Sequence, residues 1–164
     1  MPTVKFICLA NSYKNRARCV AGIRTDNGAW ILPIGAMDDG ALTTVETTCT
    51  NGAQPQLLDI LRVQLGAPCP QPHQPDNWSC SGVAGCRWEW VRRASDDELR
   101  ALRDQAVSHG LVFGTNGDRI AHADLKEKPI AASLVLLSPK RLRWKVARRV
   151  ADGPLKCRVT FVLD

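Results

Sequence analysis

The sequence predicts a mostly β protein with minor α content, built as two small modules with one helix between them. Three observations support this: short runs of alternating apolar and polar residues, turn signals between those runs, and a single helix-capping motif. Of the 164 residues, 45% are hydrophobic and 23% are charged, as in ordinary globular proteins. A chain of this length can bury a core without help from a metal or a disulfide.

The first part of the chain is expected to form a curled β module. A polar, basic loop over residues 11–18 and a Thr-Asp-Asn-Gly turn over residues 25–28 separate the first three strands, and Pro33 ends the third. Farther along, Leu61 and Val63 alternate with polar residues, as in a half-buried strand. The strands are expected, in chain order, over residues 4–10, 19–23, 29–32 and 57–65.

The middle of the chain combines an extended segment, a strand and the helix. Four prolines lie between residues 66 and 85, which favours an extended course over the surface. Residues 87–91 read as a strand that carries two tryptophans on one face. Ser95 and Glu98 then fit a capping box, so a helix is expected to begin there and to end at Gly110.

The last part of the chain predicts an apolar strand over residues 133–137 and a hairpin with its turn at residues 151–154. Residues 140–158 hold eight cationic side chains against one acidic one, whereas the whole chain has a net charge of +6. The positive excess therefore lies in this hairpin, which indicates a surface that faces a polyanion. Alternation along the strand places Leu142, Trp144 and Val146 on an apolar inner face, and Arg141, Arg143 and Lys145 on the opposite, basic face.

Five short motifs follow one another in the first 80 residues: CLANS at 8–12, RCVAG at 18–22, WILP at 30–33, LLDI at 57–60 and PHQPDNW at 72–78. Their combination resembles the bacterial family of dual OB-fold-containing domain proteins, and a weaker similarity continues over residues 118–119 and 133–139. The resemblance implies two small oligonucleotide-binding-type β-barrels, placed here at residues 1–110 and 111–164. The second barrel is expected to be partial, because family members continue past the position of Asp164. The alternative is that another element, for example one from a second chain in a homodimer, completes its sheet.

Two groups of residues are predicted to bind nucleic acid. Several cations on one firm surface bind phosphates and release counterions, and OB-type barrels bind oligonucleotides on such a face. In the loop, a tyrosine among cations offers a ring on which a base stacks. The alternatives are a solvated hairpin loop and an edge strand protected by its charge. The predicted residues are Tyr13, Lys14, Arg16, Arg18, Arg141, Arg143, Lys145, Arg149, Lys156 and Arg158.

A second hypothesis is a sensor or accessory module that binds a nucleotide or another small anionic ligand. The Pro-rich segment and the family motif at residue 11 supply polar side chains for such a ligand. Asp76 and Asn77 equally suit turns in which they cap their own backbone. The predicted ligand-binding residues are Asn11, Ser12, His73, Asp76 and Asn77.

The third hypothesis is an enzyme, with a metal-dependent nuclease as its most plausible form. Asp38, Asp39, Glu46 and Asp59 match no nuclease motif, and nothing in the sequence places a base such as His73 beside the Cys19 thiol. The spacing of Cys69, His73, Cys80 and Cys86 misses the paired pattern of zinc sites. We therefore predict no metal, no cofactor and no catalysis, and a function in binding single-stranded nucleic acid with low sequence specificity.

The sequence also bears on the compartment. The first residues lack a signal-peptide pattern, and no apolar run reaches the length of about 18 residues that a membrane span requires. The chain has seven cysteines, an odd number, and three of them lie in strand-like patterns. A reduced, cytoplasmic protein without disulfides is expected. Trp30, Trp88, Trp90 and Trp144 are expected in the core, and Trp78 partly exposed.

Overall fold

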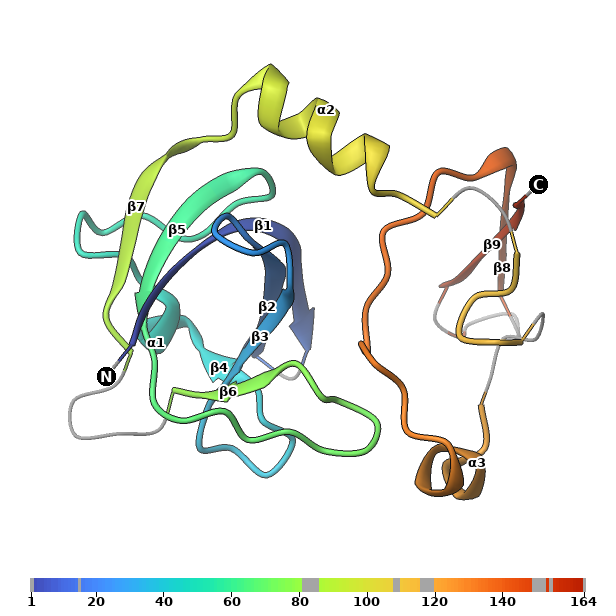
Figure 1. The fold of residues 1–164 in the computed structure, drawn as a ribbon, viewed down its shortest axis with the longest axis horizontal. Coiled ribbons are helices and arrows are strands. Elements are labelled where there is room, and N and C mark those ends of the chain that lie inside the picture. The colour runs from blue at the N-terminus through green and yellow to red at the C-terminus, as the bar shows by residue number, and fades with distance from the viewer. Residues whose placement is uncertain are drawn as a thin grey trace. The chain divides into compact units, whose positions relative to one another are not determined.

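The computed structural model describes residues 2–14, 16–80, 86–107, 110–115, 120–148, 153 and 155–163. Strand exceeds helix, as predicted (Figure 1). Among the described residues, no helix is long and apolar enough to cross a membrane. The strands are β1 (Thr3–Lys14), β2 (Ala17–Arg24), β3 (Trp30–Ile34), β4 (Leu42–Thr43), β5 (Asp59–Gln64), β6 (Asn77–Ser79), β7 (Trp88–Arg93), β8 (Lys140–Arg148) and β9 (Leu155–Val162), and the helices are α1 (Thr44–Thr47), α2 (Asp96–Asp104) and α3 (His122–Glu127).

The chain divides into two compact units, and neither is continuous in sequence. The first unit contains residues 1–98 and 121–134, and the second contains residues 99–120 and 135–164. These units are defined by contacts, whereas the two predicted OB-type modules are continuous stretches of sequence. The predicted division into residues 1–110 and 111–164 therefore stays a prediction.

The first unit is a curled seven-stranded sheet with the order β6-β3-β2-β1-β5-β7, in which β4 also pairs with β2 (Figure 1). All pairs are antiparallel except β3 with β6. The sheet is not closed into the expected barrel, because its outermost strands β6 and β7 do not pair with each other. A single bridge joins β7 at Trp88 to Cys49, just after α1. The second unit holds a separate two-stranded sheet of β8 and β9.

The first hairpin is longer than the sequence predicted. Residues 11–14 and 17–18, expected in a loop, continue β1 and β2 with a register that runs to Lys14 opposite Ala17. Arg16 has a φ of 63° in the turn, directly before β2 begins at Ala17. Strand β4 pairs with β2 at Ala17 and Arg18, so a distant segment helps to hold these residues in a strand.

Strand β3 continues through Pro33, which was expected to end it. Trp30 and Ile31 pair with β2, whereas Leu32 to Ile34 pair with β6. The Leu32 backbone N–H donates to the Asp76 carbonyl and the Cys80 N–H donates to the Ile34 carbonyl, so the parallel ladder passes over residue 33. The N–H that proline lacks is therefore not needed there.

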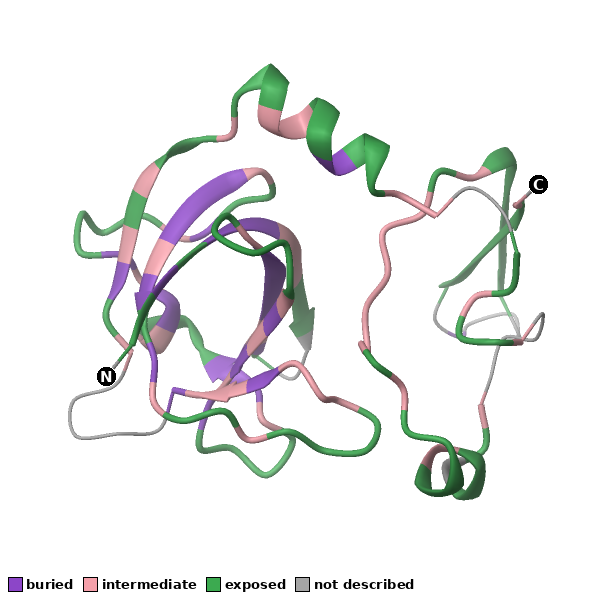
Figure 2. Ribbon diagram, in the orientation of Figure 1, coloured by how far each residue is buried: buried purple, intermediate pink, exposed green. Residues whose placement is uncertain are grey.

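The core of the first unit lies between the curled strands (Figure 2). Phe6 and Trp88 are fully buried and meet edge to face, with ring centroids 6.1 Å apart. Gly22 lies directly against β1, and a β-carbon at this position would collide with the Ile7 carbonyl group. The buried cluster also contains Val4, Cys8, Val20, Ile31, Leu42, Cys49, Leu61, Val63, Leu65 and Cys80.

The predicted capping box at the start of α2 is confirmed. The Glu98 carboxylate accepts from the Ser95 backbone N–H at 2.8 Å, and the Glu98 N–H donates to Ser95 Oγ at 3.4 Å. Arg92 also donates two hydrogen bonds to this carboxylate. These bonds, from Arg92 first and from the Ser95 backbone second, lower the pKa of Glu98 to about 2.

Two features between the expected elements differ from the prediction. The short helix α1 has its own capping box, in which Glu46 and Thr43 bond each other's backbone N–H groups. Residues 133–137 form no strand; Leu137 makes only an isolated bridge with Val107. The apolar run resembles a strand in sequence, but Ser133 donates its backbone N–H and its hydroxyl to the Asp76 carboxylate instead of to a ladder.

The expectation of a protein without disulfides is wrong, because Cys80 and Cys86 form a disulfide bond with their Cα atoms 5.0 Å apart. Cys80 follows β6 and Cys86 precedes β7, so the bond joins the two outermost strands of the sheet. Burial raises the pKa of the free Cys8 thiol to about 12, with Asp59 adding to the rise. Cys8 is therefore an inert core side chain.

Candidate nucleic-acid interface

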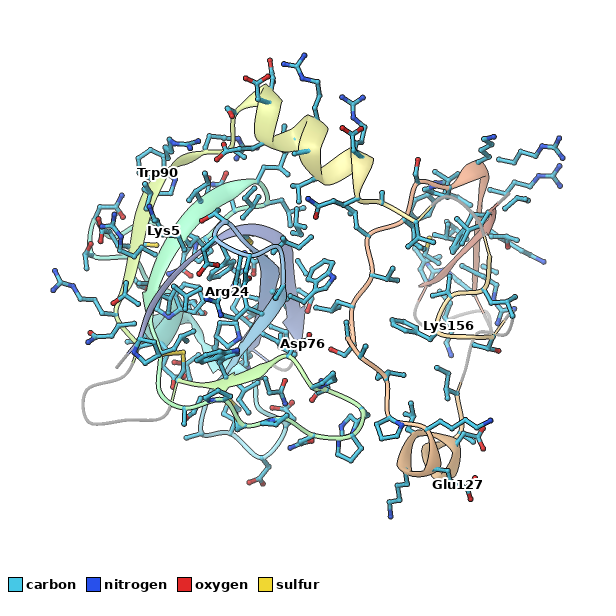
Figure 3. The ribbon with its side chains drawn as sticks, in the orientation of Figure 1. Lys5, Arg24, Asp76, Trp90, Glu127 and Lys156 are labelled. Atoms are coloured by element: carbon cyan, nitrogen blue, oxygen red, sulfur yellow. A yellow bond between two sulfur atoms is a disulfide. The ribbon has the colours of Figure 1, made fainter. Side chains whose placement is uncertain are left out.

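The hairpin of β8 and β9 presents cations on one face, and its register shows why. Arg143 lies opposite Thr160, Lys145 opposite Arg158, and Ala147 opposite Lys156. Residues that face each other across an antiparallel pair point to the same side, and every second residue of a strand does so too. Arg143, Lys145, Lys156 and Arg158 therefore share one side of the ribbon, which we call the basic face; Lys156 is labelled in Figure 3.

A bulge changes the predicted position of one cation and adds another. Lys140 lies opposite Val162, but the next pair is Arg143 with Thr160, so β8 contains one extra residue. Arg141 lies in this bulge with a φ of 53°, and simple alternation does not place it with Arg143. Lys140, which the sequence reasoning missed, lies on the side of the basic face because its partner Val162 does. Arg149 lies outside the described residues.

The cations of the basic face are exposed and close to one another. Among the described parts of the chain, Arg143, Lys145 and Lys156 have no ion pair or hydrogen bond from their side chains. Lys145 and Arg158 lie directly opposite, where β-carbons are about 5 Å apart and like charges destabilise a sheet. A polyanion bound to this side of the ribbon would interact with both cations.

The other face of the hairpin is apolar, as predicted, but it is not a core. Trp144 is 68% exposed, Val146 60% and Leu142 51%. On β9, the same side carries Val159, which lies opposite Trp144, and Phe161 two residues on. The alternation was correct, but the two strands form a sheet of their own, and in the described part of the second unit no third strand extends it. Trp90 was also expected in the core and is 41% exposed.

In the first unit, the predicted tyrosine lies at the end of the β1–β2 hairpin. Tyr13 is 61% exposed, and the Arg18 guanidinium lies 5.2 Å from the centre of its ring. Arg18 also donates to Asn11 Oδ1 at 3.3 Å, and Asn11 donates to the Pro55 carbonyl at 2.6 Å. The structure thus brings Tyr13, Arg18 and Asn11 together, and holds Asn11 between two partners.

The remaining residues of this group lie along the same hairpin. Ser12 is exposed and lies opposite Cys19, and Arg16 is exposed at the turn. Lys14 ends β1 opposite Ala17. One face of Tyr13 is covered by Arg18, so a base would stack on the ring from its other side.

Three of the predicted small-ligand residues lie in β6 or in the segment before it. The Asp76 carboxylate accepts from the Ser133 backbone N–H at 2.7 Å and from its hydroxyl at 2.8 Å (Figure 3). Asn77 is only 1% exposed, donates to Gln74 Oε1 at 3.4 Å, and leaves its own buried Oδ1 without a partner. His73 is exposed in the turn before β6. The structure therefore places His73 at the surface and Asn77 inside the unit.

Among the described residues, no group of three or more His, Cys, Asp or Glu side chains is arranged to hold a metal. Cys80 and Cys86, two of the four soft ligands considered, are bonded to each other. Two of the carboxylates considered for a nuclease also have structural roles: Glu46 caps α1, and Asp59 accepts from the Gln56 backbone N–H and lies 3.5 Å from Arg93.

The protein is mostly β: strands dominate, and no long helix occurs in the described part of the chain. This architecture is consistent with a dual OB-fold domain. The chain belongs to the dual OB-containing domain family, whose family model matches residues 4–164. This confirms the resemblance seen in the sequence motifs. No curated protein and no solved structure matches the chain.

Proposed function

We propose that this protein binds single-stranded nucleic acid through the basic face of the β8–β9 hairpin, with little sequence specificity. The observation that carries the proposal is the register, which gathers Arg143, Lys145, Lys156 and Arg158 on one side of an exposed ribbon. Successive cations on each strand are about 7 Å apart. Such a row follows a phosphate backbone without reading bases.

An exposed aromatic ring supports the choice of a single strand. Tyr13 is more than half exposed, and unpaired bases stack on such rings in proteins that bind single strands. In duplexes the bases already stack on one another, although a two-stranded ribbon also fits the major groove of DNA. Competition by duplex therefore belongs in the test.

The proposal is tested by fluorescence anisotropy with a labelled oligothymidylate at several salt concentrations. Each neutralised phosphate of a single strand contributes about 0.7 to the slope of log affinity against log salt. Four contacts give a slope of about 2.8, so affinity should fall about fiftyfold between about 50 and 200 mM salt. Unlabelled single strand should displace the probe better than the duplex of the same sequence. Absence of binding at the lowest salt, or preferential displacement by duplex, would refute the proposal.

A further inference from the structure

The second unit contains a cavity of about 970 Å³ along one side of β9. Seven consecutive residues, 157–163, line it, together with residues 110–112 and 115 from an earlier segment of the second unit. Consecutive residues of a strand point to opposite faces, so a cavity that touches all of them runs along the strand's edge rather than over a face. No described residue of β8 lines it. The cavity therefore follows the edge of β9 that faces away from β8.

This edge carries backbone groups that no strand pairs with in the described part of the chain. Within the described residues, the second sheet consists of β8 and β9, and β9 pairs with β8 on its other edge. An unpaired edge is a template for an added strand. A sheet of two strands is marginally stable in water and gains stability from a third. Seven residues in an extended conformation span about 24 Å, so the groove accommodates a short strand.

The chemistry of the groove defines what that strand should be. Leu111, Val112, Val159 and Phe161 supply apolar contacts. No Asp or Glu occurs among the described residues that line the cavity, and Arg158 lies in it. The surrounding segment, residues 140–158, has eight cationic side chains and one acidic one. A second copy of β9 would add more positive charge at this edge, whereas an acidic strand would reduce it.

We propose that the edge of β9 binds an extended acidic peptide segment, in which apolar side chains alternate with Asp or Glu. The peptide adds to the sheet as a third strand, with backbone hydrogen bonds to β9 providing affinity and the two rows of side chains providing selectivity. The apolar row contacts the side of Val159 and Phe161, and the acidic row lies on the side of Lys156 and Arg158. The proposal does not depend on nucleic-acid binding.

The test uses the full chain and a seven-residue peptide that alternates glutamate and valine, measured by isothermal titration calorimetry. Two further peptides carry N-methyl groups on either the valine or the glutamate amides. Only every second residue of a strand directs its N–H toward one neighbour, so the two N-methylated peptides should differ in affinity by at least about tenfold. Equal affinities, or no binding at about 1 mM of the unmodified peptide, would overturn the proposal.

The second part of the test uses protein variants at Leu111. Leu111 lines the cavity and is 60% exposed, so substitution should not disturb folding. L111D should weaken the glutamate–valine peptide by at least about tenfold, and L111N, which lacks the charge, should weaken it less. Neither variant should alter oligothymidylate affinity by more than about twofold, because Leu111 is not on the basic face. Sedimentation velocity of the unliganded chain is the final check: a dimer abolished by L111D would assign the edge to a second copy and overturn the proposal.

Discussion

Replacing three cations of the basic face by glutamine should remove most of the salt dependence of nucleic-acid binding. R143Q, K145Q and K156Q together change exposed residues whose side chains have no ion pair or hydrogen bond within the part of the chain that the structure describes. If each side chain contacts a phosphate, the slope of log affinity against log salt should fall by about 2. The fiftyfold loss of affinity between about 50 and 200 mM salt should become roughly threefold.

A matched variant separates the location of the charges from their number. K5Q, K126Q and K128Q remove the same three charges from exposed positions of the first unit. Anisotropy titrations should give this control the slope of the parent, since net charge alone does not form phosphate contacts. Circular dichroism melting should show that both variants remain folded. An unchanged slope in the hairpin variant, or an equal change in the control, would refute the assignment of the basic face to phosphate binding.

Three stability predictions follow from single contacts in the first unit. E98Q should lower the free energy of unfolding by about 0.5 kcal/mol at neutral pH, because glutamine can still bond the Ser95 N–H but lacks the charge that pairs with Arg92. Because the folded pKa of Glu98 is depressed to about 2, this contribution should be complete above about pH 4.5 and disappear as pH falls toward 2 in urea titrations. Reduction of Cys80–Cys86 should lower this free energy by about 2 kcal/mol, and reductant should leave a doubly serine-substituted variant unchanged in the same assay. G22A should lower the thermal midpoint through a loss of about 2 kcal/mol, because the added methyl group meets the Ile7 carbonyl; a parent-like midpoint would contradict the packing of β2 on β1.

Local features of the fold were predictable where residues close in sequence determine them. The capping box at Ser95 and Glu98 was visible as two residues three apart, and the structure forms both of its hydrogen bonds. The same signal was present at Thr43 and Glu46 and would have located α1. Alternation likewise gave the two faces of the C-terminal hairpin, since the period of a strand is fixed by its geometry.

Features that depend on distant residues were not predictable. Alternation assigns Trp144 to a face but does not show whether another layer covers that face, and the side chain is largely exposed. The parallel pairing of β6 with β3 joins segments more than forty residues apart, and the sequence carries no local signal for it. The Asp76 carboxylate accepts from Ser133, 57 residues away, and the sequence carried no signal for this contact; a role of Asp76 in ligand binding stays a prediction. A carboxylate in a turn looks the same in sequence whether a ligand or a distant backbone group occupies it.

The bond between Asp76 and Ser133 has a consequence for how the chain is made. The first unit contains residues 1–98 and 121–134, and residues 99–120 between these two segments belong to the second unit. During synthesis, residues 1–98 emerge from the ribosome well before Ser133, and until then the Asp76 carboxylate lacks both donors that the finished protein supplies. The sheet can form early from its own strands, but its last side-chain contacts wait for a segment translated after part of the second unit. Any fragment that ends near residue 100 stops at that intermediate stage.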